Sequence, residues 1–231
     1  DLRTIGNGLL CGLLGARGVG REIAVACMDA GFHVVLAEAS DESLEVGVAR
    51  IIEHYDSRVA AGKMTEDAVE DTLDRLQATS GYAMLADADV IIDPGPSITR
   101  AQITKVDASL KAGAIIGTGT ETVDVATVAG ATSRPSDVAG FRLFPGMGRN
   151  RLAEIIPGRE TAPTTVATLR LLARKLNRLV IETGRGKTGI GQRIEEALHA
   201  SADLCVLEGA DVARVDAVLR DWGLPHGSFG A

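Results

Sequence analysis

A glycine-rich turn and one acidic residue have the types and the spacing that hold a dinucleotide. The turn reads Gly-Ala-Arg-Gly-Val-Gly over residues 15–20, and Glu38 follows about 20 positions later. Glycines in such a turn permit a tight bend, let a pyrophosphate approach a helix N-terminus and let the helix pack closely on a strand, while the acid holds a ribose diol. The sequence therefore predicts an NAD site. The predicted cofactor-binding residues of this segment are Gly15, Arg17, Gly18, Val19, Gly20 and Glu38.

Arg17 stands where the dinucleotide pattern has its middle glycine. That glycine lets the backbone touch the phosphate, so a side chain here obstructs the approach, and Gly18 compensates only in part. Two outcomes stay open. Either Arg17 weakens the docking of the pyrophosphate, or its guanidinium swings out and pairs with the phosphate. Glu38 favours NAD over NADP, because a carboxylate repels a 2′-phosphate.

The residues around the turn have the order that a β-α-β unit needs. An apolar run at 9–14 precedes the turn, a helical pattern follows it as far as Gly31, and a second apolar run at 34–37 ends in Glu38. These periodicities predict strand, helix and strand in turn. The glycine turn is thus expected at the end of one strand and the acid at the end of the next.

The remaining segments alternate strands with helices, which predicts an α/β fold with a Rossmann-like, mainly parallel sheet covered on both faces. After the second strand, a helix capped by Ser40 and a helix capped by Thr65 and extending to Leu76 form a helical-pair insertion. The last part of the chain is expected to be all-helical, so we predict a dinucleotide-binding domain at 1–186 and a helical piece at 187–231. Later strands are expected at 90–93, 114–117, 138–144, 152–156 and 178–182, and later helices at 100–110, 123–129, 164–176, 190–207 and 211–222.

Composition and charge argue against several classes of protein. The net charge of −7 argues against nucleic acid as a partner, and an aromatic content of 3% leaves few platforms on which bases could stack. Three cysteines at apolar positions are expected to be buried free thiols, and the four histidines lack the spacing of metal ligands. The chain shows no signal peptide and no apolar span of membrane length. We expect a cytoplasmic protein with no metal and no membrane partner.

Seven segments of the chain stand in a characteristic order, and they are 15–20, Glu38, 62–65, 86–93, 138–144, 152–154 and 222–227. Together they resemble the L-3-hydroxyacyl-CoA dehydrogenases of fatty-acid β-oxidation, and the resemblance covers essentially the whole chain. It implies an NAD domain followed by an all-helical domain, of which this chain carries the first part, and oxidation of 3-hydroxyacyl-CoA to 3-oxoacyl-CoA. The same module occurs alone and inside multifunctional proteins.

The resemblance also implies which positions belong to the catalytic site. The family's catalytic His falls on Arg142, and its partner carboxylate falls on Glu154, which is retained. Arginine stays protonated at any relevant pH and cannot accept the proton of a hydroxyl group. Further catalytic positions fall on Glu121 and Gln192, and Gly119 is expected among the cofactor-binding residues.

Several alternatives stay open for these residues. Arg142 is expected within salt-bridge distance of Glu154 or Glu121, unless the alignment has slipped and Arg142 is a surface arginine. Glu154 is otherwise an ordinary solvated carboxylate. Asp93 ends a strand on the cofactor side, where it would hold the ribose or a water molecule, or cap the loop. Lys63 would approach CoA phosphates, as the resemblance implies, or act as a C-terminal helix cation.

Three functions follow from these residues. The first is an NAD-dependent 3-hydroxyacyl-CoA dehydrogenase with impaired activity. The second is a non-catalytic domain that binds a nucleotide or acyl-CoA, or serves a structural role, within a multifunctional protein. The third is a related reductase with Glu154 or Lys187 as proton donor. The expected partners are an acyl-CoA and either a second copy of the chain or the rest of a multifunctional chain, with an apolar helix face around Leu198 and Leu207 available for packing.

Overall fold

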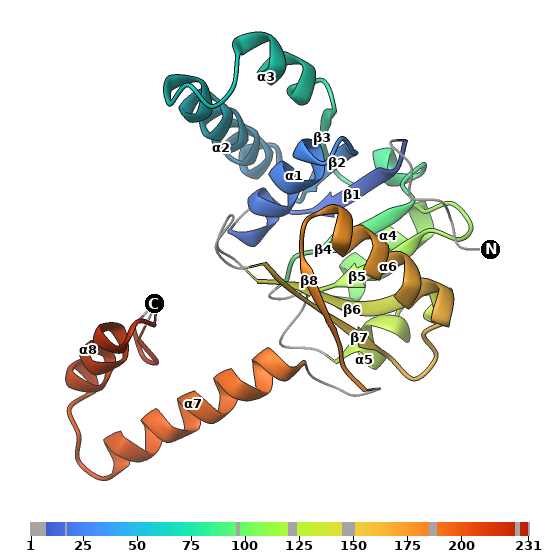
Figure 1. The fold of residues 1–231 in the computed structure, drawn as a ribbon. Helices are drawn as coiled ribbons and strands as arrows, with labels where there is room; N and C mark the ends of the chain where they lie inside the picture. Colours follow the sequence, from blue (N-terminus) through green and yellow to red (C-terminus); the bar gives the residue numbers. More distant parts are fainter. Residues whose placement is uncertain are drawn as a thin grey trace. The chain divides into compact units, whose positions relative to one another are not determined.

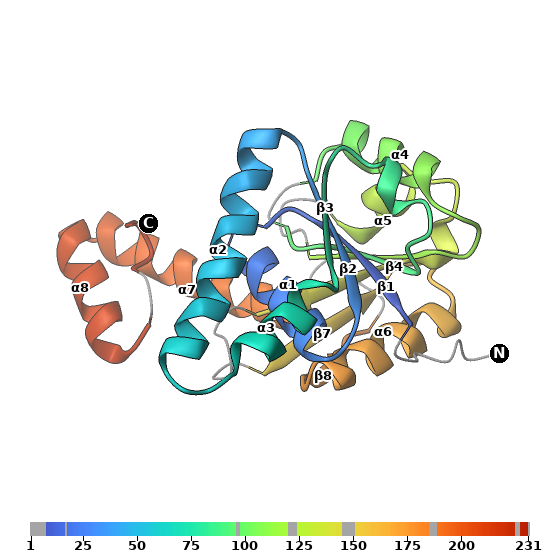
Figure 2. The ribbon, with the colours of Figure 1, turned by 90° about the horizontal axis from the view of Figure 1, so that it is seen from above.

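The first part of the chain folds as one sheet with helices on both of its faces (Figures 1 and 2). The chain divides into two compact units, residues 1–187 and residues 188–231, and each is described by itself. The computed structural model describes residues 8–16, 18–95, 98–119, 124–144, 151–184, 189–224 and 227–230.

The described strands form an eight-stranded sheet in the order β3-β2-β1-β4-β5-β6-β7-β8. Strands β1 to β6 are parallel, whereas β7 runs antiparallel to β6 and carries β8 parallel to itself. The order reverses between β1 and β4, which is where open α/β sheets bind ligands at the carboxyl ends of their strands. The strands are β1 Leu10–Leu14, β2 His33–Glu38, β3 Leu76–Ser80, β4 Val90–Asp93, β5 Ile115–Thr118, β6 Val138–Leu143, β7 Leu152–Pro157 and β8 Leu179–Glu182.

The helices cover both faces of this sheet, as predicted. Buried residues of α1, α2, α3 and α6 join one apolar cluster, and those of α4 and α5 join a second cluster on the other face. Because both faces are buried, the central strands are apolar at nearly every position. The helices are α1 Val19–Asp29, α2 Asp41–Ala60, α3 Glu66–Leu73, α4 Arg100–Ser109, α5 Val125–Ala129, α6 Pro163–Lys175, α7 Ile190–Leu207 and α8 Val212–Trp222, with short 3-10 turns at Ala83–Leu85 and Pro135–Asp137.

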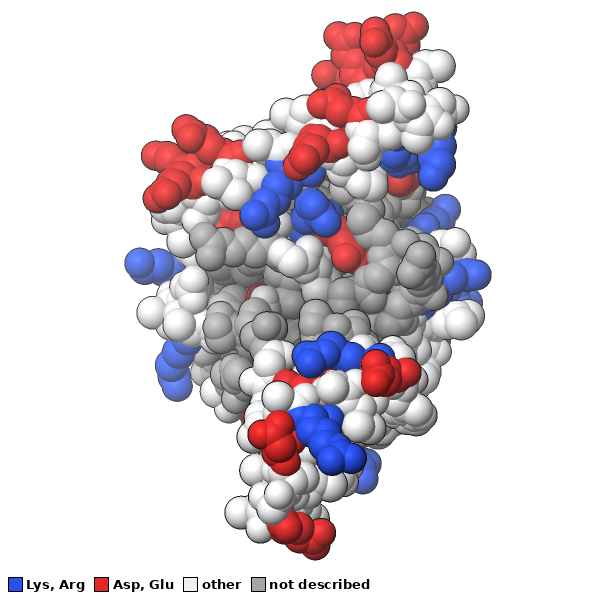
Figure 3. Space-filling view, turned by 90° about the vertical axis from the view of Figure 1, so that its left-hand side faces the viewer, with Lys and Arg blue, Asp and Glu red and all other residues white. Residues whose placement is uncertain are grey.

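The insertion after β2 is the helical pair α2 and α3. Ser40 and Thr65 cap these helices, as predicted, by accepting hydrogen bonds from the backbone N–H groups of Ser43 (3.2 Å) and Ala68 (3.3 Å). The α2 helix is fixed on the sheet by Ile51 and by other buried side chains. On the face shown in Figure 3, acidic side chains gather over the projecting end of this pair.

Two sequence predictions were wrong. Leu76 does not belong to the second inserted helix, because α3 ends at Leu73 and Leu76 begins the edge strand β3. That strand is largely exposed and polar, so it lacks the apolar run that indicated the other strands. Cys205 is exposed on α7, whereas Cys11 and Cys27 are buried free thiols as expected.

The second unit consists of α7 and α8 followed by a short turn. Asp216 of α8 is 5% exposed, and its carboxylate accepts hydrogen bonds from the N–H groups of Phe229 (3.1 Å) and Gly230 (2.7 Å). Large apolar side chains on these helices are exposed within the unit, including Leu207 and Trp222. Among the helices of the described residues, none has both the length and the hydropathy that crossing a bilayer requires.

Candidate functional site

The glycine turn after β1 has the geometry that a bound diphosphate needs. Gly15 and Gly18 adopt positive φ angles of 95° and 52°, which side chains disfavour, and the N–H of Gly15 donates to Ala37 O at 2.9 Å. A Cβ on Gly20 would lie 2.1 Å from Gly15 O, so α1 packs against the turn more closely than any side chain permits. Gly18 is the N-cap of α1 and has no side chain that could accept hydrogen bonds from the N–H groups of the first turn. Helix N-termini of this kind can bind an anion through those N–H groups.

Arg17 lies outside the described residues, so the two predicted outcomes for its side chain stay predictions. The residues on either side of it, Ala16 and Gly18, are described. Val19, which the sequence placed in the turn, begins α1.

Glu38 is at the carboxyl end of β2, where the sequence predicted it. It is buried, and its Oε1 accepts a hydrogen bond from Ala16 N at 2.6 Å. This bond ties the acid to the glycine turn on the neighbouring strand. The carboxylate is therefore held in one place at the edge of the sheet, which is what recognition of a ribose diol requires.

Glu38 and Asp93 line one cavity of about 120 Å³ at this edge, although 55 residues separate them in sequence. The sequence analysis did not identify two other residues of this cavity, Tyr82 and Gln102. Gln102 has a sequence signal, because Thr99 and Gln102 form a capping box at the start of α4. We find no such sequence signal for Tyr82.

Asp93 at the end of β4 is 5% exposed and accepts two hydrogen bonds. Thr118 Oγ1 donates to its Oδ2 at 2.7 Å, and Gly95 N donates to its Oδ1 at 3.1 Å. Burial raises the pKa of the Asp93 carboxyl group, and the two hydrogen bonds partly oppose that effect. The loop-capping alternative is thus observed, while contact with a ligand stays a prediction.

Gly119 joins the ends of β4 and β5. Its N–H donates to Asp93 O at 2.7 Å, and a Cβ at this position would lie 3.1 Å from both Asp93 O and Pro94 O. Glu121, two residues later, lies outside the described residues, as does Lys187.

Arg142 and Glu154 lie directly opposite each other on the antiparallel strands β6 and β7. Glu154 is fully buried at 0% exposure, and Arg142 is 9% exposed with its guanidinium carbon 4.7 Å from the centroid of the Phe144 ring. The alternatives of a surface arginine and of a solvated carboxylate are therefore both wrong. Burial of two opposite charges at facing positions favours the predicted ion pair, which stays a prediction.

Gln192 belongs to the second unit. It lies on α7, and its Nε2 donates a hydrogen bond to Glu196 Oε1 at 2.9 Å, one helical turn further on. Its predicted catalytic role stays a prediction. The structure thus brings together Gly15, Glu38, Asp93 and Gly119 at one sheet edge and sets Arg142 against Glu154 where β6 and β7 pair.

The family model described as "3-hydroxyacyl-CoA dehydrogenase, NAD binding domain" matches residues 11–186. A fatty acid oxidation complex subunit alpha from Psychrobacter arcticus is 28% identical over 218 residues, which is 93% of this chain and 30% of that protein. The corresponding subunit from Acinetobacter baylyi is 26% identical over the same share of each chain. The chain thus spans about 30% of the length of these relatives.

Solved structures of two dehydrogenases are also similar. The (S)-3-hydroxybutyryl-CoA dehydrogenase from Ralstonia eutropha is 25% identical with a TM-score of 0.81, covering 95% of this chain and 79% of that one. The 3-hydroxybutyryl-CoA dehydrogenase from Escherichia coli K12 is 26% identical with a TM-score of 0.81, covering 96% of this chain and 48% of that one.

Proposed function

The chain belongs to the family of 3-hydroxyacyl-CoA dehydrogenase NAD-binding domains, and on that premise we propose that it binds NAD and an acyl-CoA of fatty-acid oxidation but transfers the hydride slowly. Residues 1–186 form the NAD domain, and residues 187–231 begin the helical domain that follows it. The observation that carries this proposal is the pairing of buried Arg142 with buried Glu154 at the positions of the family's proton-abstracting dyad.

The residues at the edge of β1, β2 and β4 fit a bound dinucleotide. The uncapped N-terminus of α1 fits the diphosphate, and the anchored carboxylate of Glu38 fits the adenosine ribose. NAD, when bound, supplies the acceptor of a hydride. The carboxylate of Glu38 at this position also disfavours the phosphorylated dinucleotide by charge repulsion.

The chain lacks a general base where the family has one. A guanidinium group stays protonated, so Arg142 holds a positive charge at the end of β6 and cannot remove the proton of the 3-hydroxyl group. A positioned general base contributes about 10²–10⁴-fold to such a step. Arg142 can instead attract the substrate oxygen, which orients the acyl chain without activating it.

A non-catalytic domain within a multifunctional protein is the second candidate. The buried residues Arg142 and Glu154 favour it. The length of the relatives also favours it, because the chain spans only about 30% of them. The exposed apolar side chains of α7 and α8 would then pack against further helices, either of the same chain or of a second copy. We place this protein in the cytoplasm.

Titration with NADH, followed by fluorescence, tests the proposal. The native chain and an Arg17→Gly variant are compared, and each is then assayed for oxidation of a 3-hydroxyacyl-CoA. We expect both to bind NADH and the variant to bind more tightly, with slow turnover in both. Fast oxidation of the 3-hydroxyacyl-CoA by the native chain would contradict the proposal that its activity is impaired. Binding by the variant alone would favour the non-catalytic domain.

A further inference from the structure

A hollow that we call the acidic groove lies between the two inserted helices, α2 and α3. It has a volume of about 560 Å³. The residues that line it recur at intervals of three or four along each helix, from Asp56 to Ala60 on α2 and from Glu66 to Asp74 along α3. Residues at that spacing share one side of a helix, so each helix turns a single face toward the groove.

The bottom of the acidic groove is aliphatic. Val59, Val69 and Leu73 line it, and of these Val69 is buried whereas Val59 and Leu73 are half-buried. Ile52, one turn before Asp56 on the same side of α2, is 40% exposed and extends this apolar strip. An apolar groove of this kind can receive the apolar face of an amphipathic helix.

Carboxylates surround the aliphatic strip. Asp56 of α2 and Glu66, Glu70 and Asp74 of α3 line the groove and are exposed, and none of the described lining residues is basic. Within the part of the chain that the structure describes, these four carboxylates belong to no ion pair. The groove therefore presents negative charge that its own walls do not neutralise.

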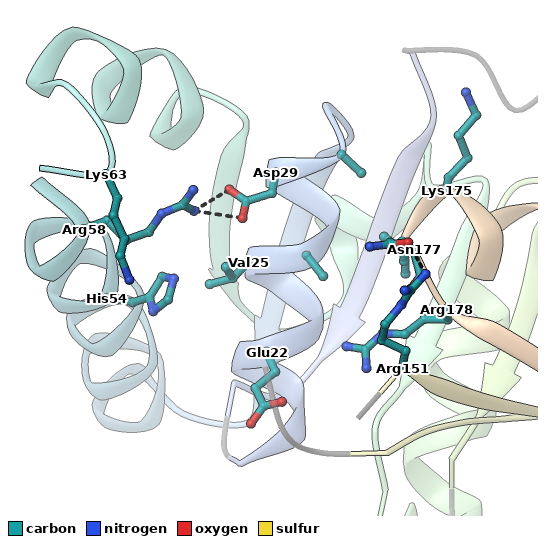
Figure 4. A pocket seen from close by; sticks show the side chains of 13 residues that line it. Glu22, Val25, Asp29, His54, Arg58, Lys63, Arg151, Lys175, Asn177 and Arg178 are labelled. Atoms are coloured by element: carbon teal, nitrogen blue, oxygen red, sulfur yellow. Dashed lines mark hydrogen bonds and ion pairs between the residues drawn. The ribbon is translucent and has the colours of Figure 1, made fainter. Parts of the chain in front are cut away.

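The basic side chains of the insertion line a different hollow, beside α1 (Figure 4). There Arg58 donates through Nη1 to the two carboxylate oxygens of Asp29, at 3.0 and 2.8 Å, and Lys63 lines the same hollow. Because an α-helix turns once every 3.6 residues, Arg58 lies on the side of α2 opposite to Asp56 and Ala60. The cations of the insertion are thus turned away from the acidic groove.

The row of acids on α3 destabilises the helix that carries it. Glu66 and Glu70 are four residues apart, as are Glu70 and Asp74, and like charges at this spacing repel each other across one turn. Asp74 is also the C-cap of α3, whose last turn has no basic residue, so the helix dipole opposes its negative charge. Cations supplied by a partner would relieve both effects.

We propose that the acidic groove binds an amphipathic helix of another protein. The aliphatic side chains of that helix would pack on Val59, Val69 and Leu73, and its Lys or Arg side chains would pair with the carboxylates of the two walls. Charge complementarity selects this occupant, because an anionic lipid surface or an acidic segment would be repelled.

The acidic groove is independent of the proposed function. The nucleotide edge, formed by Gly15, Glu38, Asp93 and Gly119, contributes no residue to the lining of the groove. Occupation of the groove is therefore expected to leave NADH binding unchanged.

Titration with a synthetic peptide tests the proposal. The probe is a fluorescently labelled amphipathic helix of about 15 residues, with Leu on one face and Lys on the others. A peptide of the same composition in scrambled order has no apolar face, and a third peptide has Glu in place of each Lys. We expect the first peptide to bind, the other two to bind at least about tenfold more weakly, and the affinity of the first to fall as salt is added.

Two double variants of α3 locate the site. Glu66→Gln with Glu70→Gln removes two carboxylates of the groove, whereas Asp67→Asn with Asp71→Asn removes two exposed carboxylates of the same helix that do not line it. Both double variants change the net charge by the same amount, and each removes one acid of the first turn of α3. The glutamate variant should weaken peptide binding about tenfold, and the aspartate variant should leave it nearly unchanged. Asp56→Asn, on the other wall, should also weaken it.

Three outcomes would overturn the inference. Equal weakening by the two double variants would show that the peptide responds to the charge of the whole insertion, and equal binding of the ordered and scrambled peptides would exclude a helix in the groove. Sedimentation of the native chain without peptide tests a second copy as the occupant. Self-association that disappears when Glu66 and Glu70 are both replaced by Gln would assign the groove to another copy of this chain. NADH affinity, measured in every variant, reports on the proposed function separately.

Discussion

The nucleotide edge and the pairing of β6 with β7 differ in how far they keep the family's chemistry. At the edge, Gly15, Gly20 and Glu38 have the residue types that a dinucleotide requires, and only Arg17 departs from the pattern. At the pairing of β6 with β7, Arg142 lies opposite Glu154, and the proposed function assigns Arg142 to the position of the family's general base. Under the proposed function, the first region can bind the cofactor, whereas the second lacks a base that could start the hydride transfer.

The difference between the regions follows from what else each residue does. Gly20 permits the close contact between α1 and the turn, Glu38 ties two strands together, and Asp93 caps a loop. Replacing any of them would therefore disturb the fold as well as the proposed binding of the dinucleotide. At the proposed base position on β6, Arg142 lies opposite Glu154, and a guanidinium group has the donor geometry to pair with a carboxylate. Chemistry can therefore be lost there without loss of structure.

The substitution Arg142→His should have the largest effect on this comparison. Restoring an imidazole opposite Glu154 should raise the rate of 3-hydroxyacyl-CoA oxidation about 10²-fold, the lower end of what a general base contributes, since Glu121 and Gly119 still differ from the family. The measurement is NADH formation under saturating NAD. Arg142→Gln, which cannot act as a base, is the control. Equal rates in the two variants would show that the missing base does not limit turnover.

Gly20→Ala would test whether the nucleotide edge is structural. The added methyl group would meet Gly15 O, which is backbone and cannot move aside. We expect a loss of about 1–3 kcal/mol in the free energy of unfolding, together with much weaker NADH binding. Chemical denaturation and NADH titration measure the two effects. Gly8→Ala, at a position with no atom within 4 Å of the added methyl group, should change neither.

Asp93→Asn should have a smaller effect that depends on pH. Burial raises the pKa of Asp93 in the folded state, so the folded protein holds this proton more tightly than the unfolded chain does. The stabilisation from the protonated carboxyl group is complete below the unfolded pKa and is lost as the pH rises through the folded pKa.

The asparagine variant lacks this titration. Relative to the native chain, Asp93→Asn should therefore be least stable at low pH and should recover as the pH rises. Denaturation curves of both proteins across the acidic range measure the effect. A difference in stability that does not change with pH would show that burial does not perturb this carboxyl group.

Much of the fold could be predicted because its signals are local. The glycine turn, the apolar runs at 9–14 and 34–37 and the caps Ser40 and Thr65 each specify their own conformation within a few residues. The strand at Leu76 could not be predicted in this way. It is an exposed edge strand, and its conformation is set by pairing with β2.

The sequence by itself determined the β-α-β unit, the place of the acid that ends β2 and the presence of an arginine at position 142. These depend on periodicity, on backbone freedom and on the chemistry of single side chains. Only the tertiary structure decided that Glu154 is fully buried opposite Arg142, that Asp93 shares a cavity with Glu38, and that basic side chains of α2, of Arg151 before β7 and of the α6–β8 turn line one hollow beside α1. Such placements depend on strand register and on helix packing between segments far apart in the chain, and no short stretch of residues encodes them.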